Sequence, residues 1–194
     1  MQLSELKIIV TGGARGMGAH FATRLHEAGA KVVAADLDTE GLAALPSGIH
    51  TRVCNVAVES ECESLVAWAH EQMGGLNGLI NNAGIIQPFK RLLDLDEAAM
   101  ERVMRVNFWG TLHMTRAFLP RLLKRPEAHL VNVSSMGAFV PVPGQALYGA
   151  SKAAVMLLTE ALWAELQGTP VRVPLVLPGA MRTVIAEHSG VEAP

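Results

Sequence analysis

The sequence has few cysteines, few aromatic residues and no long apolar run. Its 194 residues include two cysteines, Cys54 and Cys62, and a disulfide framework or a cysteine metal site would need more ligands at tighter spacing. No apolar run is long enough to cross a bilayer, and the apolar part of the first ten residues is too short for a signal peptide. We therefore expect no metal, no membrane partner, reduced thiols and a cytoplasmic location.

Charge is also sparse. Only 18% of residues are charged, the formal net charge is −2, and the basic residues form no stripe. This excludes the electrostatic pattern of nucleic-acid binding proteins. Half of the residues are hydrophobic, so the length and composition predict one globular domain spanning 1–194.

Short apolar segments alternate with longer helical ones. Alternation of this kind implies crossover connections, and apolar runs such as VPLVL are typical of strands buried on both faces. We predict an α/β fold, a Rossmann-type doubly wound parallel sheet. The predicted strands are Lys7–Thr11, Lys31–Asp36, His50–Val53, Gly78–Asn81, His129–Ser134 and Val171–Leu177; the predicted helices are Met17–Ala28, Glu40–Leu45, Ser60–Met73, Glu97–Leu123 and Tyr148–Leu166.

A glycine-rich segment follows the first predicted strand and opens the first helix. It reads TGGARGMG over 11–18. Glycines allow close backbone approach to a pyrophosphate, and a helix N-terminus offers free N–H groups and a positive dipole end. An ordinary glycine turn is the alternative, but the flanking strand and helix favour a phosphate loop.

The second predicted strand ends at Asp36, 18 residues after Gly18. An acid at about this distance accepts hydrogen bonds from the ribose hydroxyls and repels a 2′-phosphate. This favours NAD over NADP as the cofactor. Arg15 is the contrary signal, because a guanidinium could pair with a 2′-phosphate.

Tyr148 and Lys152 lie four residues apart at the start of a predicted helix, so they share a face. Tyr148 is the only tyrosine in the chain. A lysine cation beside a tyrosine lowers the tyrosine pKa and makes it a usable acid/base. Taken alone, this spacing is common.

Together with other motifs, the Tyr148–Lys152 spacing becomes a specific signal, because all of these motifs occur in the order found in one family. They are TGGARGMG, Asp36, NNAG at 81–84, Asn107, Ser134-Ser135, YGASK at 148–152 and Pro178-Gly179 with Thr183. From about Leu6 to Thr183 the sequence resembles the short-chain dehydrogenase/reductase family.

The resemblance implies roles by position. Tyr148 is similar to the family's catalytic acid/base, Lys152 to the residue that holds the nicotinamide ribose, Ser135 to the serine that binds the substrate oxygen, and Asn107 to the asparagine that positions a relay water. The resemblance implies an NAD-dependent oxidoreductase that interconverts a small, secondary alcohol and its carbonyl compound. The cofactor-binding residues it implies are Gly12, Arg15, Gly16, Met17, Gly18, Asp36, Leu37, Asn55, Val56, Asn82, Ala83, Gly84, Tyr148, Lys152, Pro178, Gly179, Met181 and Thr183.

The sequence departs from the family at three places. Asn55 stands where the family usually has an aspartate against the adenine; its oxygen could still accept a bond from the adenine amino group, without charge. Pro174 interrupts the strand Val171–Leu177 and makes its pairing uncertain. The sequence ends at Pro194, so we expect the family's last strand and substrate lid to be missing, which favours a non-catalytic nucleotide-binding module as the alternative function. A non-redox enzyme of the same fold is a further alternative.

Two predicted helices are apolar over most of their surface, the first around Phe108–Leu119 and the second around Ala153–Trp163. The sheet covers one side of each helix, so a second subunit is the expected cover for the other. We therefore expect a homodimer or homotetramer. The identity of the substrate is not readable from the sequence.

Overall fold

A twisted parallel sheet forms the centre of the protein, in a computed structural model that describes residues 2–179, 185, 189 and 191. Within these residues the sheet has seven strands in the order β3-β2-β1-β4-β5-β6, with β7 also paired to β5. All the pairings are parallel. The strands are β1 Lys7–Thr11, β2 Lys31–Asp36, β3 His50–Val53, β4 Gly78–Asn81, β5 Ala128–Val133, β6 Val171–Arg172 and β7 Leu175–Val176.

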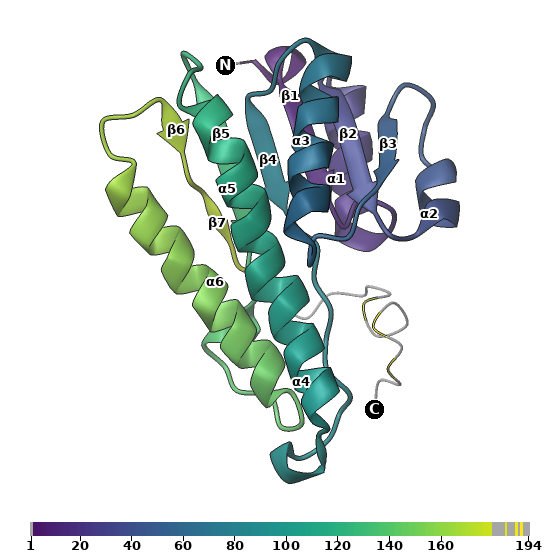
Figure 1. The fold of residues 1–194 in the computed structure, drawn as a ribbon, viewed down its shortest axis with the longest axis vertical. Coiled ribbons are helices and arrows are strands. Elements are labelled where there is room, and N and C mark those ends of the chain that lie inside the picture. The colour runs from purple at the N-terminus through teal and green to yellow at the C-terminus, as the bar shows by residue number, and fades with distance from the viewer. Residues whose placement is uncertain (1, 180–184, 186–188, 190, 192–194) are drawn as a thin grey trace.

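Helices cover both faces of this sheet. They are α1 Gly16–Glu27, α2 Thr39–Ala43, α3 Glu59–Met73, α4 Glu97–Met104, α5 Gly110–Leu122 and α6 Ala146–Glu165. In Figure 1, α3, α5 and α6 lie in front of the sheet. Short 3-10 turns occur at Leu3–Glu5, Leu92–Asp94 and Met136–Ala138.

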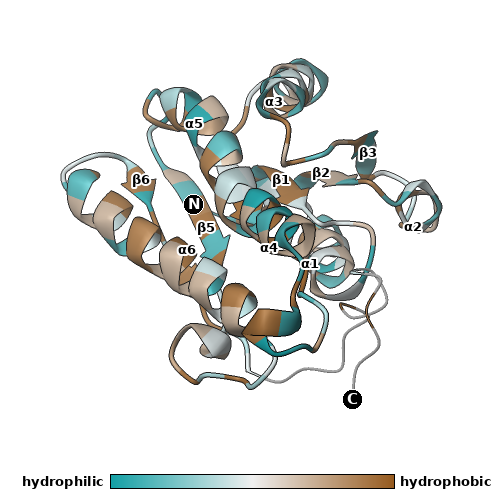
Figure 2. Ribbon diagram, turned by 60° about the horizontal axis from the view of Figure 1, so that its bottom comes forward, coloured by the Kyte–Doolittle hydropathy of each residue, from teal (hydrophilic) through white to brown (hydrophobic). Residues whose placement is uncertain are grey.

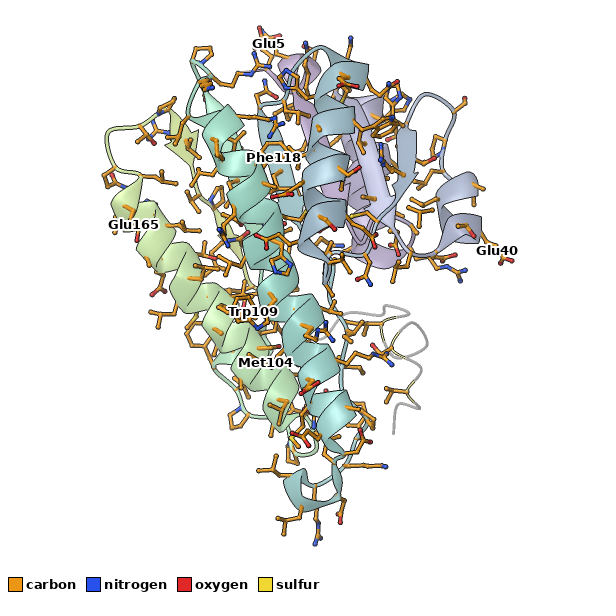
Figure 3. All side chains as sticks on the ribbon, in the orientation of Figure 1. Glu5, Glu40, Met104, Trp109, Phe118 and Glu165 are labelled. Carbon is orange, nitrogen blue, oxygen red and sulfur yellow. The ribbon has the colours of Figure 1, made fainter. Side chains whose placement is uncertain are left out.

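The sheet divides the hydrophobic core into two clusters, one on each face, and successive side chains of β1 belong to one cluster and then the other. Ile8 and Val10 belong to the cluster that includes residues of α1 and α2, whereas Ile9 belongs to the cluster beneath α3, α5 and α6. Phe118 of α5 is fully buried in the second cluster (Figure 3). The doubly wound parallel sheet predicted from the sequence is therefore confirmed.

One predicted helix proves to be three elements. The stretch Glu97–Leu123 contains α4, a π-helical turn over Arg105–Trp109, and α5. A π turn inserts an extra residue into the helical repeat and is frequent at functional sites. Asn107 lies at the centre of this turn and is fully buried.

The predicted strand Val171–Leu177 is interrupted at Val173–Pro174, and β6 and β7 lie on either side. Both short strands nevertheless pair with β5, since the Asn132 N–H donates to the Pro174 carbonyl at 3.1 Å. Proline lacks a donor but keeps its acceptor, so the pairing survives without a continuous strand.

Candidate active site

A cleft of about 990 Å³ opens at the carboxyl ends of the strands. Ligands of open α/β sheets bind at this edge, where the strand order reverses. The reversal here is between β1 and β4, which carry the glycine loop and the NNAG segment. The cleft is lined by Gly12, Arg15, Gly16, Met17, Asp36, Leu37, Asp38, Cys54, Asn55, Val56, Ala57, Val58, Asn82, Ala83, Gly84, Ile85, Ala98, Glu101, Arg102, Arg105, Val106 and Ile185.

The glycine loop is closed tightly against α1. A Cβ on Gly18 would lie 1.9 Å from the Gly12 carbonyl oxygen, so no larger residue fits there. The side chain of Arg15, the N-cap of α1, makes no capping hydrogen bond to the first turn of the helix, whose N–H groups have no partner within the helix. Asn82 supports the loop, because its Nδ2 donates to the Thr11 and Gly12 carbonyls at 3.1 and 3.0 Å. A backbone cradle at an uncapped helix start fits the pyrophosphate of a dinucleotide.

Asp36 lies beside this loop and holds it. One carboxylate oxygen accepts from the Ala14 N–H at 3.0 Å, and the other accepts from the Leu37 N–H at 2.7 Å. Arg15 forms an ion pair with Asp38 at the same end of the cleft. The cleft therefore presents two carboxylates to a ribose here, with a guanidinium already paired to one of them.

Ser135 and Tyr148 lie on either side of Gly137. The Ser135 hydroxyl accepts a bond from the Gly137 N–H at 3.0 Å, and a Cβ added at Gly137 would lie 3.4 Å from both Ser135 Oγ and Tyr148 Cε1. Burial raises the pKa of Tyr148, and the contact with Ser135 offsets part of this rise. Neither residue lines the cleft itself; the contact of this region with the cleft wall is made by Lys152, one helical turn after Tyr148, which reaches Gly84.

Lys152 is buried, and its Nζ donates to the Val133 carbonyl at 3.0 Å. Burial lowers the pKa of Lys152 to about 8. The added Cβ of a side chain at Gly84 would lie 3.2 Å from Lys152 Nζ and 3.4 Å from Asn107 Oδ1. The ammonium and the amide oxygen therefore converge over Gly84, at the wall of the cleft.

Asn107 joins two segments that carry the site. Its Oδ1 accepts from the Ile85 N–H at 2.9 Å, and its Nδ2 donates to the Ile85 carbonyl and to Ser151 Oγ at 3.0 and 2.9 Å. The π turn brings the side chain to this position. Asn107 thus fixes the segment after β4 against α6.

The remaining predicted residues have different outcomes. Val56 lines the cleft, and Asn55 does too, although its side-chain oxygen accepts from the Ala57 N–H at 3.0 Å. The Pro178 carbonyl accepts from the Met136 N–H at 2.9 Å, and a Cβ added at Gly179 would meet no atom of the described residues within 4 Å. The predicted residues Met181 and Thr183 lie outside the described residues.

Gln87 is a site residue that the sequence did not reveal. It is fully buried, and its Oε1 accepts from the Leu147 and Tyr148 N–H groups at 2.7 and 3.0 Å. The side chain at the N-cap of α6, Gln145, makes no capping bond. Gln87 therefore caps the helix that carries Tyr148 from a segment about sixty residues away, a contact without a local sequence signal.

We expect Gln87→Leu to lower kcat by about tenfold or more and the free energy of unfolding by about 2–4 kcal/mol. The leucine leaves two partly buried N–H groups without this acceptor, each costing about 1–2 kcal/mol, the lower part of the range for a buried group, and it loosens the backbone of Tyr148. Urea denaturation and steady-state kinetics measure the two effects. Gln87→Glu, which keeps the acceptor oxygen, is the matched control and should retain more of both. Equal kcat in the leucine variant and the unaltered protein would contradict the capping role.

Within the described residues, no group of three or more potential ligands among His, Cys, Asp and Glu could hold a metal ion. None of the helices that the structure describes is long and apolar enough to cross a membrane.

The fold and the placement of these side chains define a nucleotide-dependent oxidoreductase of the α/β class. The sequence matches the short chain dehydrogenase family over residues 6–192, and the chain belongs to that family. It is an oxidoreductase of this family, and two of the solved structures similar to it are complexes with NADP+ and with NAD.

Three relatives illustrate the match. The 1-deoxy-11-beta-hydroxypentalenate dehydrogenase of Streptomyces avermitilis is 38% identical over 195 residues, which cover 94% of this chain and 71% of the relative. A short chain dehydrogenase/reductase from Burkholderia phymatum in complex with NAD has a TM-score of 0.91 and 31% identity, covering 96% of this chain and 70% of that one. A closed serine dehydrogenase complexed with NADP+ has a TM-score of 0.88 and 28% identity, covering 93% and 75%.

Proposed function

We propose that the protein is an NAD-dependent oxidoreductase that interconverts a small secondary alcohol and its carbonyl compound. The observation that carries the proposal is the approach of Ser135 Oγ and the Tyr148 ring to Gly137, together with the buried Lys152, whose Nζ reaches Gly84 at the wall of the cleft. The two buried, free thiols, Cys54 and Cys62, support a cytoplasmic location.

Each residue has a role in this proposal. Ser135 and Tyr148 bind the substrate oxygen through their hydroxyls, and Tyr148 takes the hydroxyl proton during oxidation or returns it during reduction. Lys152 supplies positive charge and a donor near the tyrosine and the ribose. NAD, when bound, supplies the nicotinamide ring that exchanges the hydride. Asn107 holds the segment after β4 in place, beside Lys152.

Two features favour NAD over NADP. The Asp36 carboxylate lies at the ribose end of the cleft, and Arg15 pairs with Asp38. A 2′-phosphate would meet both carboxylates, and like charges at close range are repulsive. The names of relatives give both cofactors, so the assignment for this chain rests on these residues.

The test of this function mixes the protein with NAD and a panel of secondary alcohols at alkaline pH, and follows the absorbance of reduced nicotinamide. Reduction of NAD with at least one alcohol is expected. Tight NAD binding by folded protein, with no reduction across a broad panel, would instead favour a nucleotide-binding protein without turnover. It would also fit a non-redox enzyme.

We expect Asp36→Ala to narrow the preference for NAD over NADP by about tenfold or more in kcat/KM. The substitution removes the carboxylate that repels a 2′-phosphate and leaves Arg15 in place. Kinetics with both cofactors measure the ratio, with Glu40→Ala as a surface control that removes one acid outside the cleft. An unchanged ratio would refute the ribose role of Asp36.

We also propose that the protein is a homodimer or homotetramer. Trp109 is 46% exposed beside α5, and Leu157 and Trp163 of α6 are 66% and 59% exposed. Apolar segments of α6 are visible in Figure 2. Large apolar side chains exposed on neighbouring helices are typical of subunit contacts.

Light scattering at micromolar concentration should therefore give at least twice the mass of 20.7 kDa. Leu157→Glu should shift the protein toward the monomer, because it places a charge in the apolar contact. Lys124→Glu, at an exposed position in the turn after α5, is the control. A monomer in the unaltered protein would exclude self-association.

A further inference from the structure

A second cavity, of about 490 Å³, lies at the opposite end of the sheet from the cleft of the candidate active site. It is lined by His70, Pro120, Arg121, Lys124 and Arg125. These residues belong to the ends of α3 and α5 and to the turn after α5, and the two helices pack against each other (Figure 1). From these ends the chain enters β4 and β5, so the cavity is at the amino ends of the strands, whereas the cleft is at their carboxyl ends.

The lining of this cavity is cationic. Lys124 and Arg125 follow Arg121 by three and four residues, and the turn after α5 stays tight because the Lys124 N–H donates to the Arg121 carbonyl at 3.3 Å. Residues at this spacing share one face. None of the lining residues is acidic, and no ion pair among the described residues involves Arg121, Lys124 or Arg125.

Main-chain carbonyls hold two of these cations in place. Arg125 Nε donates to the Leu76 carbonyl at 2.8 Å, and Arg121 Nη1 donates to the Ala117 carbonyl at 3.1 Å. Gly75 makes room for Arg125, because a Cβ at Gly75 would overlap the guanidinium. A guanidinium has several N–H donors, so each arginine keeps further donors for a ligand.

The helix ends explain only part of this arrangement. The carbonyl ends of α3 and α5 attract cations, which favours a basic residue at each end. That attraction does not account for the gathering of Arg121, Lys124 and Arg125 around one cavity, where their charges repel one another. A bound anion removes this repulsion, and a phosphate group matches both the forked donors of arginine and the point charge of lysine.

We propose that this cavity is a second ligand site, which binds the phosphate groups of a phosphate-bearing small molecule. Arg121 and Lys124 supply the charges that contact the anion, and Arg125 forms a fixed wall. The site is independent of the proposed oxidoreductase activity, because no residue that lines it also lines the cleft.

The test measures acetylation of Lys124 by N-acetoxysuccinimide, read by peptide mass spectrometry, with pyrophosphate as the probe. Lys124 is exposed, so its amine reacts with the reagent unless a bound anion shields it. With about 1 mM pyrophosphate at constant ionic strength, the rate at Lys124 should fall by about tenfold, which corresponds to a dissociation constant of about 0.1 mM. The rate at Lys90, an exposed lysine beyond the carboxyl end of β4, should not change.

Arg121→Gln removes one charge from the cavity and should reduce the protection of Lys124 to about twofold, because one charge-assisted hydrogen bond contributes about tenfold in affinity. Arg116→Gln is the matched control, since it removes the same charge from an exposed position of α5 outside the cavity, and it should keep the full protection. Equal protection in Arg121→Gln and the unaltered protein would overturn the proposal, as would equal slowing at Lys90 and Lys124. The absence of any slowing at Lys124 in the folded, unaltered protein would also overturn it.

Discussion

Tyr148→Phe is expected to abolish turnover while leaving NAD binding unchanged. The phenylalanine keeps the ring that packs at the start of α6 and removes the one hydroxyl that exchanges a proton with the substrate oxygen. Loss of a positioned acid/base costs about 10²–10⁴-fold in rate, and the loss of the oxygen-binding contact adds to it. Steady-state oxidation of an alcohol and calorimetric titration with NAD measure the two quantities separately.

Ser135→Ala is the companion variant. It removes the other hydroxyl of the pair and should lower kcat, while retaining the tyrosine as proton acceptor. If Tyr148→Phe keeps a substantial fraction of the activity, the acid/base is a different group and the proposed mechanism is wrong.

The stability of the protein without cofactor should increase between pH 8 and about pH 10, and Lys152→Met should remove this increase. Burial lowers the pKa of Lys152 to about 8, whereas an unfolded lysine has a pKa of about 10.4. Between these values the unfolded state binds more protons, so the free energy of unfolding rises with pH. Below pH 8 the full cost of charging the buried amine remains, about 3 kcal/mol.

Urea denaturation of both proteins from pH 7 to 10 gives the comparison. At pH 7 Lys152→Met should have the higher free energy of unfolding of the two proteins, because it has no buried charge. Loss of the hydrogen bond from Nζ to the Val133 carbonyl reduces this advantage. The difference in free energy of unfolding between the two proteins should shrink as the pH rises. Other titrating groups with shifted pKa values, Cys54, Cys62 and Tyr148, are common to both proteins and cancel in the difference. A difference that does not depend on pH would show that Lys152 is not charged at a cost in the folded state.

The sequence predicted the sheet well because its strands are buried on both faces and their apolar runs are unambiguous. It missed the division of Glu97–Leu123, since a π turn needs no glycine, proline or change in hydropathy to mark it. It located the interruption of Val171–Leu177 at Pro174 but left the pairing open, since only the folded chain shows that the Pro174 carbonyl accepts from β5.

The candidate site shows the same difference between features that the local sequence marks and features that arise only in the folded chain. Glycines, Asp36 and the Tyr148 segment were found because their chemistry depends on residue type and local spacing. Gln87 was missed because its capping bonds join segments that meet only in the folded chain. The bond from the Ala57 N–H to the Asn55 oxygen was also not predicted, because it depends on the turn that follows β3.

The bond between the Asp36 carboxylate and the Ala14 N–H has a consequence for altering cofactor preference. Asp36, which would discriminate between NAD and NADP, also accepts a hydrogen bond from the loop that would hold the pyrophosphate. A replacement at position 36 without an acceptor oxygen, such as alanine, would admit a 2′-phosphate but would also remove this bond to the phosphate loop. Asparagine would remove the negative charge and keep an oxygen for the Ala14 N–H, so the charge and the acceptor at this position are separable by a single substitution.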